Sequence, residues 1–354
     1  MATIKITGTG SFIPTITQKN EDFLTQDFYT DKKKKFPNSN NIIIKKFKKI
    51  TGIDERRYLE KGMVSSDIAA IAAKIAIEDA NIDPETLDYV ILGQNFGDIK
   101  TGNNQSDMLP SLASRVKYEL GIKNPNCVAY DIIFGCPGWI EGVIQANAFI
   151  KAGMAKKCLV IGAETLSRVV DPYDRDSMIY SDGAGACIVE ASDSKNEGVV
   201  SFATQSFTQE EAYFLYFGPS FNPDVNQKLG FIKMHGRKIY EFALTNVPNA
   251  MKIALDKSGL PITSIKKILI HQANEKMDEA IVSRFYELYD SKMPERIMPM
   301  SINKLGNSSV ATVPTLLDLI LKGNLDGHQI NKGDAIIFAS VGAGMNINAI
   351  VYQF

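Results

Sequence analysis

The chain has 354 residues, 45% of them hydrophobic and 22% charged, which excludes a disordered chain and allows one large buried core or two ordinary ones. Its formal net charge of −1 gives no overall attraction to nucleic acid or to an anionic membrane. No run approaches eighteen apolar residues, and the first residues alternate like a strand instead of forming a signal-peptide core, so a cytoplasmic location is expected.

Strands and helices are predicted to alternate along most of the chain. After an amino-terminal strand, residues 66–81 have helical periodicity with Ser66 and Asp67 as candidate caps, and "LDYVILGQ" from Leu87 follows as a buried strand. Further strands are predicted in "CLVIGAE" from Cys158, "AGACIVEA" from Ala184, "IKKILIHQ" from Ile265, "AIIFASVGAG" from Ala335 and "NINAIVYQF" from Asn346. This alternation is typical of an α/β fold.

A first internal match links the two halves of the chain. "KIAIEDANIDPETLDYVILGQ" from Lys74 matches "KIALDKSGLPITSIKKILIHQ" from Lys252 without a gap, 178 residues further on (252 − 74). Both copies read as the end of a helix, a short polar connection and a strand. In this register Gly93 falls opposite His271.

A second match lies 171 residues apart (305 − 134), between "FGCPGWIEGVIQANAFIK" from Phe134 and "LGNSSVATVPTLLDLILK" from Leu305. It aligns Gly135-Cys136 with Gly306-Asn307. Either match alone has a plain alternative, similarity by composition, but two matches in the same order favour duplication. We therefore predict two related halves, residues 1–195 and 196–354, packed around a pseudo-twofold axis.

One of the four cysteines stands apart from the others. Irregular spacing in a long chain makes disulfides and structural zinc unexpected, and Cys127, Cys158 and Cys187 lie in or beside apolar runs, where a free cysteine behaves as a small hydrophobe. Cys136 instead lies at a bend between an apolar strand-like segment and a helical pattern. A helix amino terminus favours a thiolate, so Cys136 is a candidate nucleophile, with an inert buried thiol as the alternative.

A nucleophilic cysteine needs a base or an electrostatic partner, and the chain has three histidines. His271 follows the apolar run "KKILI", at the carboxyl end of a predicted strand, where α/β proteins tend to place their sites. His328 is expected to be solvated and His235 to lie at a surface or cleft. Asn307 could be a simple helix cap. The duplication places it opposite Cys136, however, so these two residues and His271 are expected to converge between the halves.

Six segments in this order resemble the β-ketoacyl-acyl-carrier-protein synthase III family of the thiolase superfamily. They are the cysteine segment together with "TGIDERR" from Thr51, "DPYDRDSMIYSDGAGA" from Asp171, "HQAN" from His271, "GNSSVATVP" from Gly306 and "SVGAGMNINA" from Ser340. The resemblance covers nearly the whole chain. It implies an α/β, thiolase-like fold, with two pseudo-twofold-related α/β halves in a five-layered α-β-α-β-α arrangement, and a homodimer.

The resemblance also implies a reaction and a catalytic triad, Cys136, His271 and Asn307. The cysteine would take an acyl group from acyl-CoA or acyl carrier protein, and a malonyl thioester, such as malonyl carrier protein, would then condense with it as carbon dioxide leaves. His271 and Asn307 would donate hydrogen bonds to the malonyl thioester oxygen, and the backbone N–H groups of Cys136 and Ala343 would bind the acyl carbonyl. No metal or redox cofactor is implied.

Single residues separate the relatives within the superfamily. Thiolases carry a second cysteine near the carboxyl end, elongating ketosynthases carry a histidine where this chain has Asn307, and plant-type polyketide synthases carry a terminal glycine and proline motif that is absent here. No catalytic glutamate of a hydroxymethylglutaryl-CoA synthase is identified. Two alternatives stay open: a noncatalytic thiolase-fold partner subunit, and an acyltransferase that forms no carbon–carbon bond.

Departures from the family pattern concern substrate recognition. The tryptophan and arginine that grip the CoA adenine in the family are replaced by Lys46 and Ile50. Leu109 stands where an aromatic residue reaches across the dimer into the acyl pocket. The resemblance gives four candidate substrate-binding residues, Arg175, Asn274, Leu109 and Ile232. Arg175 has a structural ion pair as its alternative role. These departures predict a specialised relative that makes a polyketide or aryl lipid, such as an alkylresorcinol-type product.

Residues 31–49 concentrate eight lysines, at positions 32–35, 45, 46, 48 and 49. The asparagine and serine content between them favours a flexible, solvated insertion. The alternative is a docking site for an acidic carrier protein, whose attraction would be screened over about 10 Å at 0.1 M salt.

Overall fold

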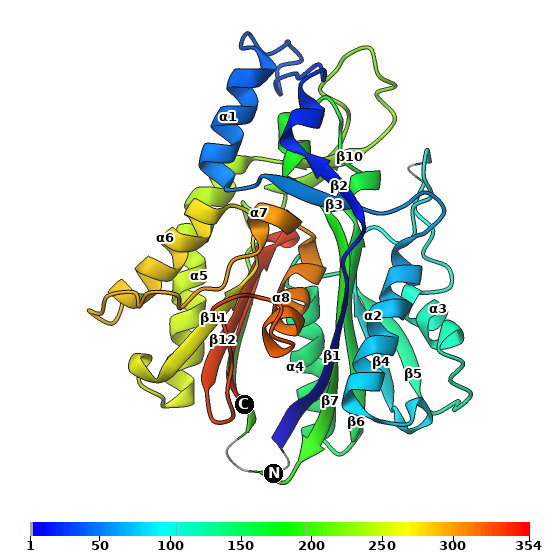
Figure 1. Cartoon of the computed structure of the whole chain (residues 1–354), viewed down its shortest axis with the longest axis vertical. Coiled ribbons are helices and arrows are strands. Elements are labelled where there is room, and N and C mark those ends of the chain that lie inside the picture. The colour runs from blue at the N-terminus through cyan, green and yellow to red at the C-terminus, as the bar shows by residue number, and fades with distance from the viewer. Residues whose placement is uncertain (1–2, 104, 195–196) are drawn as a thin grey trace.

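The fold has five layers that alternate between helices and sheets (Figure 1). The computed structural model describes residues 3–103, 105–194 and 197–354. The first sheet has the strand order β1-β7-β6-β4-β5, formed by Thr3–Phe12, Asp182–Ser192, Lys157–Thr165, Tyr89–Gly93 and Val128–Ile132. The second sheet has the order β11-β12-β13-β8, formed by Ile265–Ile270, Ala335–Gly342, Asn346–Gln353 and Gly198–Ser206. The strands predicted from the sequence are confirmed within a few residues.

Three layers of helices enclose the two sheets. The outer layer on the first sheet holds α2 (Ser65–Ala80) and α3 (Leu112–Glu119), and the outer layer on the second holds α5 (Gly236–Ser258) and α6 (Glu275–Glu287). Between the sheets lie α4 (Gly138–Lys151) and α8 (Thr312–Leu321). Strands β4 and β6 pair in parallel and are almost fully buried, as expected for strands covered on both faces.

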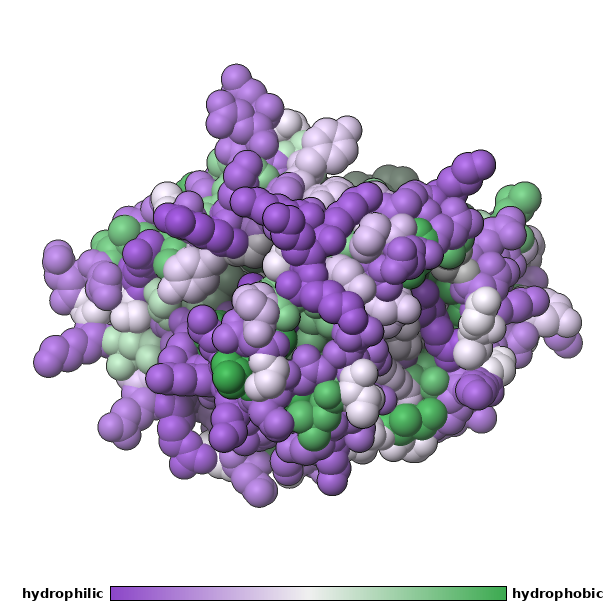
Figure 2. Space-filling model, turned by 90° about the horizontal axis from the view of Figure 1, so that it is seen from above, coloured by the Kyte–Doolittle hydropathy of each residue, from purple (hydrophilic) through white to green (hydrophobic). Residues whose placement is uncertain are grey.

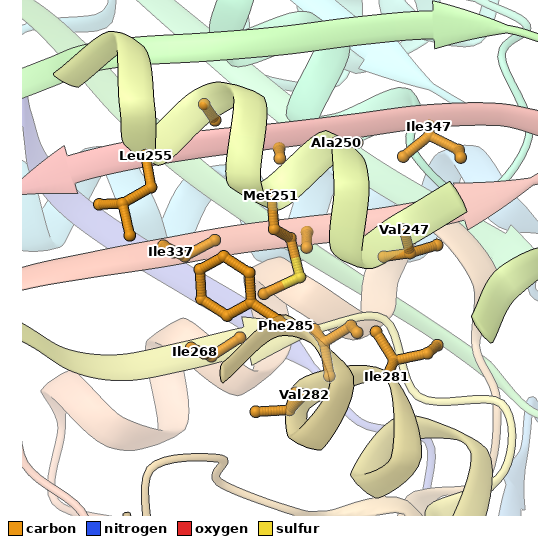
Figure 3. Packing of buried hydrophobic residues seen from close by; sticks show 14 of the residues in the cluster. Val247, Ala250, Met251, Leu255, Ile268, Ile281, Val282, Phe285, Ile337 and Ile347 are labelled. Atoms are coloured by element: carbon orange, nitrogen blue, oxygen red, sulfur yellow. The ribbon is translucent and has the colours of Figure 1, made fainter. Parts of the chain in front are cut away.

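Each interface between layers has its own apolar cluster. Figure 3 shows the one beneath α5, where Met251 of α5 and Phe285 of α6 face each other above the sheet residues Ile268 and Ile337. All four side chains are fully buried. Such packing is worth about 1.5–3 kcal/mol for each large side chain, so it fixes the layers and the strand ends that they carry.

The remaining elements are short or lie at one end of the molecule. They comprise α1 (Asn40–Thr51), α7 (Ile302–Leu305) and two antiparallel strand pairs, β2 (Ile16–Lys19) with β3 (Glu55–Tyr58) and β9 (Leu215–Gly218) with β10 (Phe231–Met234). In the part of the chain that the structure describes, seven 3₁₀ helices are formed by Asn20–Phe23, Pro84–Thr86, Leu166–Arg168, Arg175–Ile179, Ile262–Ser264, Ser309–Ala311 and Ala343–Met345. Within the described ranges, no helix is both long enough and apolar enough to cross a bilayer.

The helix ends reproduce the internal repeat. Helix α2 ends at Ala80 and α5 at Ser258, the same 178 residues apart (258 − 80), and each is followed by a residue with positive φ, Asn81 at 51° and Gly259 at 70°. The pseudo-twofold relation between the halves is therefore confirmed. The expected boundary at residues 195 and 196 lies outside the described residues, and the exact domain limits stay a prediction.

Segment 40–51 corrects the expectation of a flexible insertion. It forms helix α1, in which Ile43, Phe47 and Thr51 recur every four residues and are buried. Such spacing places all three on one face of a helix, where they can pack against the protein. The lysines between them fill the solvent-facing side. The lysine-rich segment is therefore an amphipathic helix.

The amino terminus of α2 also differs in detail from the expectation. The side chain of Asp67 accepts a hydrogen bond from the Val64 N–H at 2.8 Å, as a cap does. Ser66 instead donates through its hydroxyl to buried Asp98 at 2.6 Å. One of the two predicted caps therefore ties the helix to the loop after β4.

Candidate active site

A cavity of about 670 Å³ opens at the end of the molecule that carries α1 and β10. Its walls come from both halves, from α1, from the β9–β10 pair and from the amino-terminal turns of α5 and α6. Figure 2 views this end, where hydrophilic side chains cover most of the face and hydrophobic patches and hollows lie between them. Cys136, His271 and Asn307 all line the cavity, so the structure brings the three predicted residues together.

Cys136 lies on a tight bend that leads into helix α4. Gly135 has a φ of +69°, which favours glycine, and its carbonyl accepts a hydrogen bond from the Gly138 N–H at 3.0 Å. The bend packs directly on the turn after β12, because a Cβ added to Gly342 would lie 2.3 Å from the Cys136 nitrogen. Ala343 follows in this turn, so the two residues predicted to bind an acyl carbonyl lie on facing loops.

The Ser309 hydroxyl donates a hydrogen bond to the sulfur of Cys136 at 3.4 Å. Burial, the largest effect, raises the pKa of the Cys136 thiol to about 11, while the Ser309 hydroxyl opposes that rise. Burial therefore outweighs the helix terminus that was expected to favour a thiolate. The resting group at neutral pH is a thiol that must lose a proton when it attacks.

A half-buried residue, Asn95, and a buried one, Glu164, orient the hydroxyl of Ser309. The amide nitrogen of Asn95 donates to Glu164 Oε2 at 2.7 Å and to Ser309 Oγ at 3.2 Å. Because the Ser309 oxygen accepts from Asn95, its own hydrogen is directed at the sulfur of Cys136. Sequence reasoning missed these residues, although a glutamate inside the apolar strand "CLVIGAE" was a signal of a buried polar contact.

Glu164 is fully buried, and its second oxygen, Oε1, has no hydrogen-bond partner in the described part of the chain. Burial raises the pKa of this carboxyl to about 8, against the hydrogen bond from Asn95, which lowers it. The side chain is thus mostly a neutral acid at pH 7. A neutral neighbour spares the sulfur of Cys136 the repulsion that a carboxylate would exert on a thiolate.

Replacing Ser309 with alanine should make the thiol of Cys136 harder to ionise. The variant loses the only hydroxyl that donates to the sulfur among the described residues, so its apparent thiol pKa should rise by about one unit and alkylation at pH 8 should slow about tenfold. The rate of iodoacetamide modification across pH, followed by intact mass, measures this. Ser308→Ala is the matched control, since that hydroxyl pairs with Thr312. An unchanged alkylation profile in Ser309→Ala would refute the assignment.

Replacing Glu164 with glutamine should stabilise the fold more at high pH than at low pH. The unfolded chain ionises this carboxyl above about pH 4.3, whereas the folded chain keeps it neutral up to about pH 8. Its contribution to stability is therefore complete below pH 4.3 and falls by about 1.4 kcal/mol per pH unit up to about 8. Urea unfolding should show that the free energy of unfolding of the variant, relative to that of the native protein, is higher at pH 8 than at pH 5. Exposed Glu119→Gln should show no such trend, and equal gains at both pH values would contradict the prediction.

His271 directly follows strand β11, as the sequence predicted. Its backbone N–H donates to the Ala339 carbonyl of β12 at 2.8 Å, which fixes the residue at the strand end. The side chain is 5% exposed, and burial lowers the pKa of the imidazole to about 4, against the Ser309 carbonyl, which raises it. His271 is therefore neutral at pH 7. Its Nδ1 has no hydrogen-bond partner among the residues that the structure describes.

Asn307 follows Gly306, whose φ is +62°, as Cys136 follows Gly135. Its backbone N–H donates to the Ile179 carbonyl at 3.0 Å and its carbonyl accepts from the Ser181 N–H at 2.8 Å. The side-chain oxygen accepts from the Ser309 N–H at 2.8 Å. The NH₂ end of the amide is thus left to donate to a ligand in the cavity.

The four candidate substrate-binding residues divide into two groups. Arg175, Asn274 and Ile232 line the same cavity as Cys136. Arg175 is also close to Asp176 at 3.5 Å, and Asn274 caps helix α6 by accepting from the Met277 N–H at 3.1 Å. Leu109 is 89% exposed and does not line the cavity of its own chain. A cross-dimer role for Leu109 stays a prediction.

The three residues together suit acyl transfer followed by enolate chemistry. The thiol of Cys136 supplies a nucleophile, the neutral imidazole of His271 can accept or donate a proton, and the Asn307 amide can donate a hydrogen bond. Within the described ranges, no three His, Cys, Asp or Glu side chains are grouped as a metal site requires. The other histidines lie elsewhere: His235 is exposed at the start of α5 and His328 lies in a loop, partly buried where full solvation was expected.

Comparison with known proteins decides the family. A family model for 3-oxoacyl-[acyl-carrier-protein] synthase III matches residues 130–207, and the model for the C-terminal part of that enzyme matches residues 255–354. The β-ketoacyl-[acyl-carrier-protein] synthase III of Caldanaerobacter subterraneus is 33% identical over 345 residues, which cover 96% of this chain and 94% of that protein. The chain belongs to this family.

Other members of the 3-oxoacyl-[acyl-carrier-protein] synthase III family match over almost their full length. The enzyme of Erythrobacter litoralis is 28% identical over 350 residues, covering 99% of this chain and 98% of that protein. The crystal structure of the Aquifex aeolicus synthase III superposes with a TM-score of 0.81 at 29% identity and covers 99% of this chain and 100% of that one. The chain is thus a condensing enzyme of the acyltransferase type with a thiolase-like fold.

Proposed function

We propose that this synthase III homologue forms a β-ketoacyl thioester by a two-step reaction on Cys136. In the first step the sulfur attacks the carbonyl of an acyl thioester, and the thiol of the donor leaves with a proton. The acyl group then remains on the sulfur as a thioester. The observation that carries the proposal is the meeting of Cys136, His271 and Asn307 in one cavity.

The second step joins the acyl group to a malonyl thioester. The carbon–carbon bond to the malonyl carboxylate breaks, carbon dioxide leaves, and the resulting enolate carbon attacks the acyl carbonyl. The bond to sulfur then breaks, and the sulfur of Cys136 takes up one proton. We propose that His271 and Asn307 donate to the enolate oxygen, and that the backbone N–H groups of Cys136 and Ala343 bind the acyl oxygen.

The electrostatic state of the site supports these roles. Because burial keeps the pKa of His271 at about 4, the imidazole is neutral at pH 7 and carries one N–H and one free ring nitrogen. The same imidazole, once it carries a proton on the nitrogen facing the cavity, is a hydrogen-bond donor. No step of this scheme needs a metal or a redox cofactor.

The experiment that tests the function is a single-turnover reaction. The purified enzyme is first loaded with an acyl group, free donor is removed, and malonyl carrier protein or malonyl-CoA is added. Loss of the acyl mass from the protein, with one carbon dioxide and one β-ketoacyl thioester for each acyl group, is the expected result. Acyl release to water or to an amine or alcohol, without carbon dioxide, would instead identify a simple acyltransferase.

We also propose that the enzyme acts as a homodimer that pairs at strand β5. This strand lies at the edge of the first sheet. Its first residue, Val128, is 47% exposed, and Ile133, which follows its last residue, is 64% exposed. Unpaired edges invite pairing with another strand. Light scattering should give a mass of two chains, and Val128→Lys should shift the equilibrium toward one chain.

A further inference from the structure

Helix α1 presents two chemically different faces at the rim of the cavity. Its buried face carries Ile43 and Phe47, which form part of the cavity wall. Its other face carries Lys45, Lys46 and Lys49, all exposed. Lys46 reaches the lining of the cavity as well. The helix therefore joins a strongly basic surface to the passage that leads to Cys136.

The basic surface continues into the loop before the helix. Between residues 31 and 49 the chain has eight lysines and one acidic residue, Asp31. Lys35 pairs with Asp27 at 3.0 Å and Lys48 with Asp54. Six further lysines, which we call the lysine rim, form no ion pair with any residue that the structure describes: Lys32, Lys33, Lys34, Lys45, Lys46 and Lys49. Their charge is not neutralised within the chain.

Two exposed isoleucines lie on the same helix as the lysine rim. Ile42 is 53% exposed and Ile50 is 44% exposed, and both line the mouth of the cavity. Apolar side chains at a centre with charged ones around them are the usual anatomy of a protein interface. Exposed isoleucines among the lysines are therefore more typical of a protein-binding surface than of a segment that contacts only solvent.

We propose that the lysine rim docks an acidic acyl carrier protein, and that this carrier, and not free CoA, delivers the acyl group to Cys136. The proposal rests on the function proposed above. An acidic partner would be attracted along the whole helix, since oppositely charged surfaces raise association rates and fix orientation. A carrier also holds its thioester on a flexible arm, which suits a nucleophile at the bottom of a cavity.

The composition of the rim argues against CoA as the main donor. An adenine is best held by an aromatic ring or a stacked guanidinium, and α1 offers neither at its rim, where Lys46 and Ile50 lie beside the mouth. Two arginines line the cavity, and both guanidinium groups already have partners: that of Arg175 lies over the ring of Phe36 at 5.1 Å, and that of Arg237 pairs with Glu241 at 2.8 Å. The lysines supply charge without a stacking surface, which fits a broad acidic protein better than a planar base.

The test compares donors that differ only in what carries the thioester. The same hexanoyl group is presented on an acidic acyl carrier protein, on CoA and on N-acetylcysteamine, and the rate of Cys136 acylation is followed by intact mass. The rim variant is Lys34→Glu/Lys45→Glu/Lys49→Glu, which leaves the cavity lining intact. The matched control is Lys151→Glu/Lys156→Glu/Lys266→Glu, three exposed lysines outside the cavity lining.

The rim variant is expected to lose acylation activity with the carrier-protein donor only. The rim variant should lose about tenfold to a hundredfold in kcat/KM with the carrier donor, since each reversed rim charge changes the interaction by a few-fold. It should stay within about twofold of the native enzyme with the N-acetylcysteamine donor, and the control should match the native enzyme with all three. Raising salt should lower the native rate with the carrier and leave the rim variant almost unchanged.

Several outcomes would overturn the proposal. Equal losses in the rim and control variants would show a general charge effect, and an equal loss with N-acetylcysteamine would show damage to the wall of the cavity. Unchanged carrier kinetics combined with lost binding to phosphatidylserine vesicles would assign the rim to a membrane surface. Native acylation by hexanoyl-CoA as fast as by the carrier would refute the choice of donor. Failure of the proposed function looks different, because then no donor acylates the native enzyme.

Discussion

Replacing Cys136 with alanine should abolish acylation of the protein by every donor. The variant lacks the sulfur that attacks the thioester, and loss of a covalent nucleophile costs on the order of a millionfold in kcat in enzymes where it has been measured. Intact mass after incubation with acyl-CoA and acyl carrier protein donors should show a gain of one acyl group in the native chain and none in the variant.

A second cysteine provides the control for this experiment. Cys127 is buried, has a free thiol and lies outside the cavity lining. Burial raises the pKa of the Cys127 thiol, which further lowers its reactivity. Cys127→Ala should therefore be acylated like the native protein. If Cys136→Ala still gains an acyl group, another residue is the nucleophile and the proposed mechanism is wrong.

Replacing His271 or Asn307 with alanine should slow condensation much more than it slows loading of Cys136. Each substitution removes a donor proposed to bind the enolate oxygen, which is worth about 3–4 kcal/mol or a hundredfold to a thousandfold in rate. Release of carbon dioxide from a malonyl thioester, measured on enzyme already carrying the acyl group, isolates this step. Loading is measured separately by mass.

The effects of the His271 and Asn307 substitutions on the condensation rate should not be additive in free energy. Because both donors are proposed to bind one oxygen, the double variant should lose much less than the product of the single losses. His328→Gln is the control, since this histidine lies in a loop outside the cavity lining. Normal decarboxylation in Asn307→Ala would remove the amide from the enolate site and leave it a structural role between Ile179 and Ser181.

The sequence predicted the frame of the site because that frame depends on local patterns. Apolar runs predicted strands β4, β6, β11 and β12, and a glycine before Cys136 and before Asn307 marked two corresponding bends. The first bend leads directly into α4, whereas the second leads into the 3₁₀ helix Ser309–Ala311 and only then into α8. The repeat then related these bends through space. His271 could be placed beside them because a strand of known direction ends at that residue.

The sequence did not predict the parts of the site that depend on contacts between distant segments. Asn95, Glu164 and Ser309 come from segments far apart in the sequence. The Asn95–Glu164 hydrogen bond forms only when β6 pairs beside β4, and the Asn95–Ser309 hydrogen bond forms only when the two halves pack together. Likewise, the degree of burial around Cys136, which raises the pKa of its thiol to about 11, depends on the packing of both halves. The prediction of a flexible insertion at α1 was wrong for another reason. The many lysines of this segment favour a solvated loop by composition, but the apolar residues among them are spaced as on one face of a helix.

The two corresponding bends carry a consequence for the ancestry of the chain. A single ancestral half that paired with its own copy would have placed the same residue at both glycine-led bends, now occupied by Cys136 and Asn307. Nucleophile and hydrogen-bond donor could not then have been chosen independently. In a chain that carries both halves, a substitution at one bend does not repeat itself at the other. The asymmetry of the present site is thus a property that a pair of identical halves could not acquire.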